Sequence, residues 1–265
     1  MMTPFLIFPL PDPASIHRSH GLTGMATKGF AALDPHSALA QHRYGIFLLE
    51  NGRLDEASMR IKAALALDPL SPILNATMCN VAYYQQTYDL ALQLCDRALE
   101  IQPDQAQALI LRAASLYQKK EFAAALAHLK RARQSARGKL YYAAVESLGS
   151  TYYALGRYDL AESARQELAH SAERDHDILV NEAGLLAAMG QPEQALSILQ
   201  RASLTWPKPP VDLLYSPVFS SLRQNSQFAE VLSRRSVGPE PDLRVGGDWE
   251  VTRPGGAGGH IATFH

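Results

Sequence analysis

Alanine recurs at a nearly constant spacing along this chain of 265 residues. Successive members of the series lie 34 or 36 residues apart, at Ala57, Ala91, Ala125, Ala161 and Ala195. A second series of small residues keeps step with the first, at Gly45, Cys79, Ala113, Gly149 and Gly184. A period of this length is typical of a stack of similar supersecondary units, each unable to bury its apolar face alone.

The residues around each alanine predict the structure of one unit. Apolar residues recur three and four positions apart, which is the spacing of one helix face. Glycines precede three of the alanines, at Gly52, Gly156 and Gly190, and Pro69 and Pro103 follow the second helix of two units. Proline disfavours helix at the residue before it, so these prolines mark helix ends. Each unit is therefore predicted to be a helix, a short turn and a second helix.

This pattern resembles the tetratricopeptide repeat family, through residues such as Gly45, Ala57, Ala64 and Pro69 in the first unit. The resemblance covers about residues 37–207 and implies an all-α fold, an α-solenoid of about five repeats. The expected repeats are 38–71, 72–105, 106–141, 142–176 and 177–208. The family's tryptophan in the first helix is absent, because its positions hold Gln41, Asn75, Leu109, Val145 and Val180.

The fourth repeat departs from the others in its second helix. Arg165 stands where other repeats carry an aliphatic residue or cysteine. A charged side chain is costly to bury without a partner. We therefore expect this helix to be rotated, with Ala164 in the core instead.

The two ends of the array differ from its repeats. Residues 1–36 are expected to be irregular, and 211–235 to form a degenerate capping helical hairpin that covers the last apolar face. Residues 236–265 are rich in glycine and proline, so we expect a disordered tail.

The segment before the array also bears on location. No lysine or arginine precedes the short apolar stretch 5–10, and no small-residue cleavage site follows it, so a secretory signal is not expected. Either Met1 or Met25 suits the true start. No run of about 18 apolar residues predicts a membrane span. With only Cys79 and Cys95 present, a reducing, cytoplasmic location is expected.

In the family, the first helices line a concave groove that holds a segment of a partner protein. Projecting the repeats onto one another places three tyrosines in one column, and tyrosine is enriched at interfaces. The expected groove residues are His42, Ile46, Leu49, Asn80, Tyr83, Tyr84, Tyr117, Gln118, Glu146, Tyr153 and Asn181. The alternative is that the rings only seal contacts between helices.

Positive charge is concentrated in the third repeat. Eight basic residues and one acidic residue lie between 112 and 139, although the whole chain has a net charge of −1 and so no general attraction to nucleic acid. The expected basic patch consists of Lys119, Lys120, Lys130, Arg131, Arg133, Arg137 and Lys139. It is either a solvated helix face or a docking patch for an acidic partner.

The residues that carry chemistry do not form a catalytic pattern. Cys79 and Cys95 fall on facing helices and are interpreted as small core residues in preference to a redox pair. His260 and His265 in the tail have no neighbouring carboxylate or cysteine, so no metal site is expected. No phosphate-binding glycine loop or nucleophile elbow occurs. We expect no catalysis and no cofactor.

Three functional hypotheses remain open. The first is a non-enzymatic scaffold or adaptor that binds a partner segment, a peptide or a helix, in the concave groove. The second is a chaperone for secreted or assembling proteins. The third is the repeat module of a truncated or partner-supplied enzyme, such as an iron- and 2-oxoglutarate-dependent oxygenase, which the tail around Trp249 and His260 faintly resembles.

Overall fold

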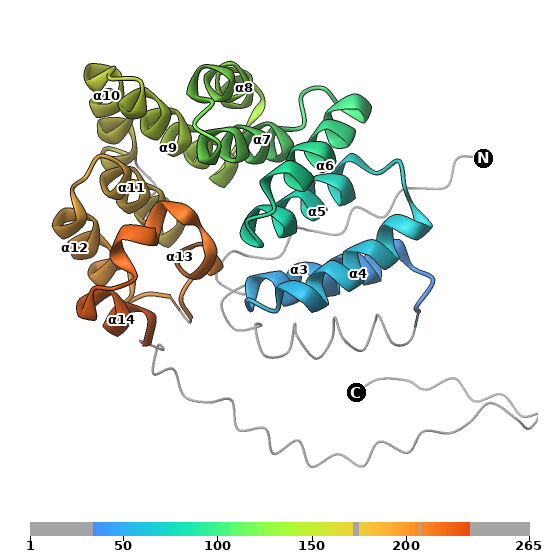
Figure 1. Cartoon of the computed structure of the whole chain (residues 1–265). Coiled ribbons are helices and arrows are strands. Elements are labelled where there is room, and N and C mark those ends of the chain that lie inside the picture. The colour runs from blue at the N-terminus through green and yellow to red at the C-terminus, as the bar shows by residue number, and fades with distance from the viewer. Residues whose placement is uncertain (1–33, 172–174, 207, 234–265) are drawn as a thin grey trace, which may run out of the picture.

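The computed structural model describes residues 34–171, 175–206 and 208–233, and every regular element within them is a helix (Figure 1). Five antiparallel pairs follow one another. They are α3 (Ala38–Glu50) with α4 (Leu54–Leu67), α5 (Pro72–Tyr84) with α6 (Tyr88–Ile101), α7 (Ala106–Gln118) with α8 (Phe122–Ser135), α9 (Lys139–Ala154) with α10 (Tyr158–Ala169), and α11 (His176–Ala188) with α12 (Pro192–Ala202). The first member of each pair is called its A helix and the second its B helix.

Three short helices complete the described part of the chain. They are α13 (Val211–Tyr215), the 3-10 helix η1 (Pro217–Leu222) and α14 (Ser226–Ser233). Both η1 and α14 pack on the last helix pair, where Phe219, Leu222 and Phe228 are buried with Trp206. The all-α solenoid with a helical cap is therefore confirmed. The expectations for residues 1–33 and for the tail 236–265 concern residues outside the described ranges.

Side-chain caps fix the starts of several A helices. The Ser37 hydroxyl accepts a hydrogen bond from the backbone N–H of Ala40 at 3.2 Å, and the Asp175 carboxylate accepts one from the N–H of Ile178 at 3.0 Å. Such caps satisfy N–H groups that have no partner inside the helix. At the other end of the unit, α4 and α6 end two residues before Pro69 and Pro103, as the sequence predicts.

The turn between the A and B helices uses a left-handed residue at the same place in every repeat. In the first, fourth and fifth repeats this residue is glycine, with φ near +72° at Gly52 and +73° at Gly156 and Gly190. In the other two repeats it is Gln86, with φ of 58°, and Lys120, with φ of 64°. Only glycine adopts this region without steric cost, so the turns of the second and third repeats are more strained than those of the other three.

The repeating small residues are the points of closest helix contact. All five alanines that define the period are completely buried. A Cβ atom placed on Gly45 would lie 2.3 Å from Ile61 Cδ1 of the B helix, and one on Gly149 would lie 2.7 Å from Leu185 Cδ2 of the next A helix. These distances are too short for a side chain, so glycine permits the observed packing.

The fourth repeat uses a shifted face, as expected. Ala164 is 6% exposed and belongs to the core, whereas Arg165 stays at the surface and forms an ion pair with Glu162 at 2.6 Å. The charge thus remains hydrated, and the small neighbour takes the buried position.

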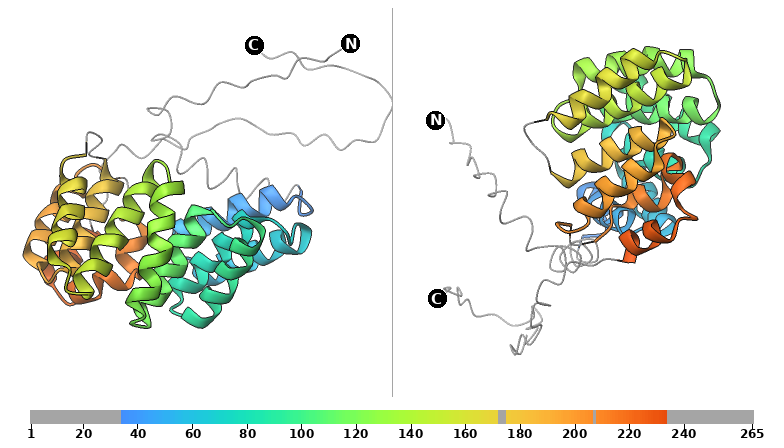
Figure 2. Two further views of the ribbon diagram at one scale, coloured as in Figure 1. Left: turned by 90° about the horizontal axis from the view of Figure 1, so that it is seen from above. Right: turned by 90° about the vertical axis from the view of Figure 1, so that its left-hand side faces the viewer.

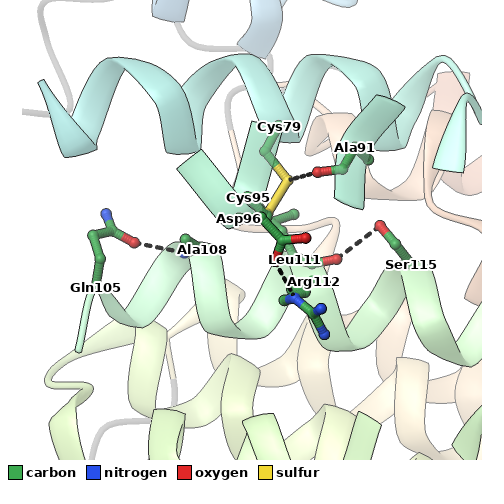
Figure 3. Close-up of a disulfide and its surroundings, with 9 residues drawn as sticks. All are labelled: Cys79, Ala91, Cys95, Asp96, Gln105, Ala108, Leu111, Arg112 and Ser115. Atoms are coloured by element: carbon green, nitrogen blue, oxygen red, sulfur yellow. Dashed lines mark hydrogen bonds and ion pairs between the residues drawn. A yellow bond between two sulfur atoms is a disulfide. The ribbon is translucent and has the colours of Figure 1, made fainter. Parts of the chain in front are cut away.

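The expectation that Cys79 and Cys95 are unlinked is wrong for this structure. The two residues form a disulfide between α5 and α6, with their Cα atoms 5.4 Å apart (Figure 3). Both are completely buried, so they are core residues as well. The sequence separation of 16 places them on facing helices of one hairpin. Glycine, alanine and aliphatic residues fill most of the equivalent positions of the other repeats, and this pattern does not distinguish a buried thiol from a disulfide.

The A helices form the inner layer of the solenoid. Each A helix contacts the A helix of the next repeat, from α3 to α5 and onward to α11. Figure 1 shows these helices as an arc, and the two further views in Figure 2 show the pairs stacked along it. All of the predicted groove residues belong to these A helices.

Candidate binding groove

The chain itself occupies part of the concave groove. After the fifth repeat, residues 208–219 turn back across the inner face, and α13 lies between α11 and the end of α3 (Figure 1). We call residues 208–219 the return segment. It contacts the first two repeats, which precede it by more than a hundred residues. No local sequence pattern predicts these contacts.

Polar side chains attach the return segment to the first two repeats. The Tyr84 hydroxyl donates a hydrogen bond to Asp212 Oδ1 at 2.5 Å, and the Tyr215 hydroxyl donates one to the Gly52 carbonyl at 3.0 Å. The Lys208 ammonium donates to the Glu50 carbonyl at 3.1 Å and to Asn51 Oδ1 at 2.9 Å. These bonds anchor the segment to the A–B turn of the first repeat and to α5 of the second.

Apolar contacts connect the same segment to both ends of the array. Val211 and Tyr215 pack against the core of the first two repeats, and the Tyr215 ring lies 6.3 Å from the ring of Tyr84. Leu213 and Phe219 are buried in the core of the fifth repeat. The return segment therefore bridges the two ends of the described array.

Beneath the return segment the groove retains a cavity of about 60 Å³. Four predicted groove residues line it, namely Tyr83, Tyr117, Gln118 and Glu146. Ser216 and Val218 of the return segment cover the same space. The open volume is too small to admit a peptide segment, so a partner that enters here must take the place of the return segment.

Glu146 is the acidic residue that lines this cavity. Its carboxylate accepts hydrogen bonds from Ser147 Oγ at 2.9 Å and Ser150 Oγ at 3.0 Å. Burial raises the pKa of Glu146 to about 7, and the negative charge of Asp212 adds to this effect, while the two serine hydroxyls oppose it. Desolvation disfavours the charged form of a carboxyl group, which explains the direction.

Asp212 and Tyr84 form a polar pair in which the tyrosine is buried and the aspartate is half-buried. Burial raises the pKa of Asp212, and Asp177 adds to the increase, whereas the hydrogen bond from Tyr84 and the charge of Lys139 lower it. Burial and the adjacent Asp212 also raise the pKa of Tyr84 well above its ordinary value. The tyrosine hydroxyl therefore keeps its proton and serves as the donor.

The predicted tyrosine column serves packing as well as the groove. Within their own repeats the rings of Tyr83, Tyr117 and Tyr153 pack on the first residue of the B helix, at centroid distances of 6.1, 5.1 and 5.1 Å. Tyr83 is only 8% exposed, and Ser216 hydrogen-bonds its side chain. Tyr117 and Tyr153 are half-buried, so they are more accessible to a partner in the groove than Tyr83 is.

The remaining predicted groove residues lie on the same A helices. His42 of α3 shares a hydrogen bond with the Thr77 hydroxyl at 3.0 Å, and burial lowers its pKa. Leu49 is buried in the core of the first repeats. Ile46, Asn80 and Asn181 are half-buried, on α3, α5 and α11 respectively. Only four of the eleven predicted groove residues line the cavity.

Acidic residues of neighbouring elements offset much of the predicted basic patch. Lys119 pairs with Asp89 at 2.6 Å, Arg131 with Asp104 at 3.6 Å, and Arg133 with Glu167 at 2.7 Å. Arg137 donates hydrogen bonds to the backbone carbonyls of Gln134 and Ala136. Lys120, Lys130 and Lys139 are exposed. Exposed pairs of this kind contribute little to stability, but they reduce the local field.

Two further observations concern chemistry and membranes. Among the described residues, no three histidine, cysteine or acidic side chains lie close enough together to hold a metal ion. The expected absence of a site at His260 and His265 concerns residues outside the described ranges. None of the described helices is both long and apolar enough to cross a bilayer.

Solved structures with a similar fold include tetratricopeptide repeat proteins. A thermophilic protein of this type from Thermus thermophilus, TTC0263, has a TM-score of 0.55 and 22% identity, over 74% of this chain and 99% of the other. PilW, a type IV pilus biogenesis factor, has a TM-score of 0.54 and 16% identity, over 78% and 92%. Pseudomonas aeruginosa PilF has a TM-score of 0.51 and 16% identity, over 79% and 93%.

The sequence comparisons add no closer relative. No protein-family model matches the chain, and no curated protein matches it. The helix pairs, their period and the structural neighbours agree with one another. This chain therefore has the fold of a tetratricopeptide repeat solenoid.

Proposed function

We propose that this protein is a non-enzymatic interaction scaffold that binds a segment of a partner protein in its concave groove. The observation that carries the proposal is that the groove already binds a chain segment, through the hydroxyl of Tyr84 and the A–B turn of the first repeat. A surface that recognises one short segment by side-chain hydrogen bonds has the chemistry to recognise another. The tetratricopeptide fold of the neighbours supports a scaffold in general.

Affinity capture with matched variants tests this proposal. The groove variant is Tyr117→Ala with Tyr153→Ala, and the outer-surface variant is Lys130→Ala with Arg133→Ala. We expect a partner captured by the wild type to be lost, or bound at least about tenfold more weakly, by the groove variant only, since buried aromatic residues dominate interface energetics. Capture by the folded groove variant at the wild-type level would contradict the proposal.

The outer-surface variant tests a second location for the partner. An acidic partner at the third repeat would be lost with Lys130→Ala and Arg133→Ala and weakened by salt, because exposed charges are screened. The ion pairs of Lys119, Arg131 and Arg133 make this surface less positive than the sequence suggests. This observation supports the groove as the proposed binding surface.

The chaperone and enzyme-module hypotheses each have a distinct outcome. A chaperone keeps its captured client soluble, so the purified client aggregates when the scaffold is withheld. A repeat module of an enzyme brings catalytic activity or bound metal with it, and metal analysis of the purified complex detects the latter. A stable, folded partner without metal supports the scaffold.

The redox state of Cys79 and Cys95 in the cell tests the location. A cytoplasmic location predicts two reduced thiols, because cytosolic reductants keep cysteines free, whereas an oxidising compartment predicts the disulfide of the structure. Alkylation in intact cells before extraction distinguishes the two.

A further inference from the structure

We propose that the return segment is an in-cis ligand of the groove, and that the partner displaces it with a segment of the same chemistry. This chemistry is an acidic residue followed three positions later by a tyrosine, as in Asp212 and Tyr215. The inference rests on the proposed function and names the partner class for the same groove.

The geometry of α13 is that of a bound recognition element. Residues three apart in a helix lie on the same face, so Asp212 and Tyr215 point together toward the first two repeats. Asp212 accepts from Tyr84, and Tyr215 donates to the Gly52 carbonyl. A helix of five residues has too few internal hydrogen bonds to persist alone, so its form depends on the surface that holds it.

The return segment also has the features of an exchangeable element. Leu213 is its buried anchor in α13, whereas the neighbouring Leu214 is 43% exposed. Prolines at 209, 210 and 217 flank the helix and supply no backbone N–H for further pairing. The attachment to the first two repeats includes hydrogen bonds made by Tyr84, Tyr215 and Lys208, and water can replace such bonds when the segment detaches.

The groove has the complementary groups for an incoming segment. Tyr84 supplies a hydroxyl donor whose proton is retained, and the A–B turn supplies the Glu50 and Gly52 carbonyls as acceptors. The ring of Tyr215 fills the space above Gly52, where a Cβ atom would lie 3.0 Å from it. An acidic residue and a tyrosine on one helical turn satisfy both features together.

Binding of a labelled peptide tests the proposal in the full-length chain. The peptide has the sequence of residues 208–222, and the receptor is the variant Asp212→Ala with Tyr215→Ala, which weakens the in-cis segment but leaves the groove intact. We expect the peptide to bind this variant at least about tenfold more tightly than the wild type. Adding Tyr84→Phe to the variant removes the donor and should abolish the gain, and Leu214→Ala alone should behave as the wild type.

Several outcomes overturn the proposal. Equal binding to the wild type and the folded variant shows that the segment does not compete, and no binding to either shows that the groove does not recognise this chemistry. A dimer detected by light scattering would show that two copies exchange their return segments. The segment would then be a ligand of the second copy and not of its own groove. A groove-dependent partner in the capture experiment would leave the proposed function intact in all three cases.

Hydrogen exchange of the wild type covers the case of a variant that does not fold. An exchangeable segment detaches while the helix pairs of the array stay folded. The amides of 211–216 should therefore exchange at least about tenfold faster than those in the middle of α5. Equal protection of the two would show that the segment leaves the groove only when the protein unfolds, which contradicts the proposal.

Discussion

At the scale of single residues, one carboxyl group makes the stability of this protein dependent on pH. Glu146 has a pKa near 7 in the folded chain, above the 4.5 of an unperturbed side chain. The folded state therefore binds this proton more tightly than the unfolded state. The resulting stabilisation is complete below about pH 4.5 and is lost as the pH rises through 7.

The variant Glu146→Gln tests this dependence, because an amide keeps hydrogen-bonding capacity and carries no charge. At pH 8 we expect the variant to be more stable than the wild type by about 1 to 3 kcal/mol, since one pKa unit corresponds to about 1.4 kcal/mol. At pH 4.5 the two should have equal free energies of unfolding. Urea titrations at both values provide the measurement, and a difference independent of pH would contradict the assignment.

The disulfide gives a second prediction at this scale. Replacing both cysteines by alanine (Cys79→Ala and Cys95→Ala) should lower the free energy of unfolding of the oxidised protein by about 3 kcal/mol, the cost expected for a loop of this length. In the third repeat alanine occupies the position equivalent to Cys79, at Ala113, whereas the position equivalent to Cys95 holds the larger Leu129.

The control for this prediction is the wild type refolded under reducing conditions, which should match the double variant. Thiol titration of the denatured, unreduced wild type should find no free thiol at these positions. Two free thiols, with equal stability of both proteins, would show that the cysteines are unlinked in solution.

At the scale of elements, the turn between the A and B helices offers a matched comparison. Gly156 has φ of +73°, and a Cβ atom there would meet no neighbour within 4 Å, so Gly156→Ala isolates the conformational cost. We expect a loss of about 1 kcal/mol. Gln86→Gly at the equivalent turn should instead be neutral or stabilising by up to about 1 kcal/mol.

Thermal and urea unfolding of the two variants provide the test. The two changes in the free energy of unfolding should have opposite signs, although both substitutions concern exposed residues of the same turn in different repeats. Destabilisation by Gln86→Gly as large as that by Gly156→Ala would show that the left-handed turn is not the source of the effect.

The elements of the array were predictable because each repeat carries its own local signals. Ala57 and Gly45 mark close contacts, and Pro69 marks a helix end, all within one unit. The shift from Arg165 to Ala164 also followed from local chemistry, namely the cost of burying a charge. These features depend on residues that are near one another in the sequence.

The return segment was not predictable, because its contacts depend on the curvature summed over five repeats. Asp212 meets Tyr84 across 128 positions, and small changes in the angle at each interface would separate them. Glu146 and Tyr117 of the predicted groove line the cavity beneath the return segment, and their role in binding a partner stays a prediction.

At the scale of the whole molecule, the return segment couples the two ends of a nearly one-dimensional array. Repeat arrays normally transmit stability only between neighbours, so their ends fray independently. Here Tyr215 and Lys208 connect the end of the array to the A–B turn of the first repeat. A change in the return segment should therefore alter the local stability of α3 and α4.

The variant Tyr215→Ala tests this coupling. Hydrogen exchange in α3 and α4 should become several-fold faster, because the first repeat loses a hydrogen bond and an aromatic contact supplied from the far end. The control is Leu214→Ala, which changes the exposed neighbour in the same helix and should leave α3 and α4 unchanged. Faster exchange confined to 211–233 would show that the ends are not coupled.

Site-specific photo-cross-linking tests most directly whether the groove is the binding surface. A photoreactive residue replaces Gln118, which lines the groove cavity, or Lys130, which is exposed on α8, and the full-length protein is irradiated in its source cells. We expect a covalent adduct with the partner from position 118 and little or none from position 130. An adduct from position 130 alone would place the partner on the outer surface and contradict binding in the groove.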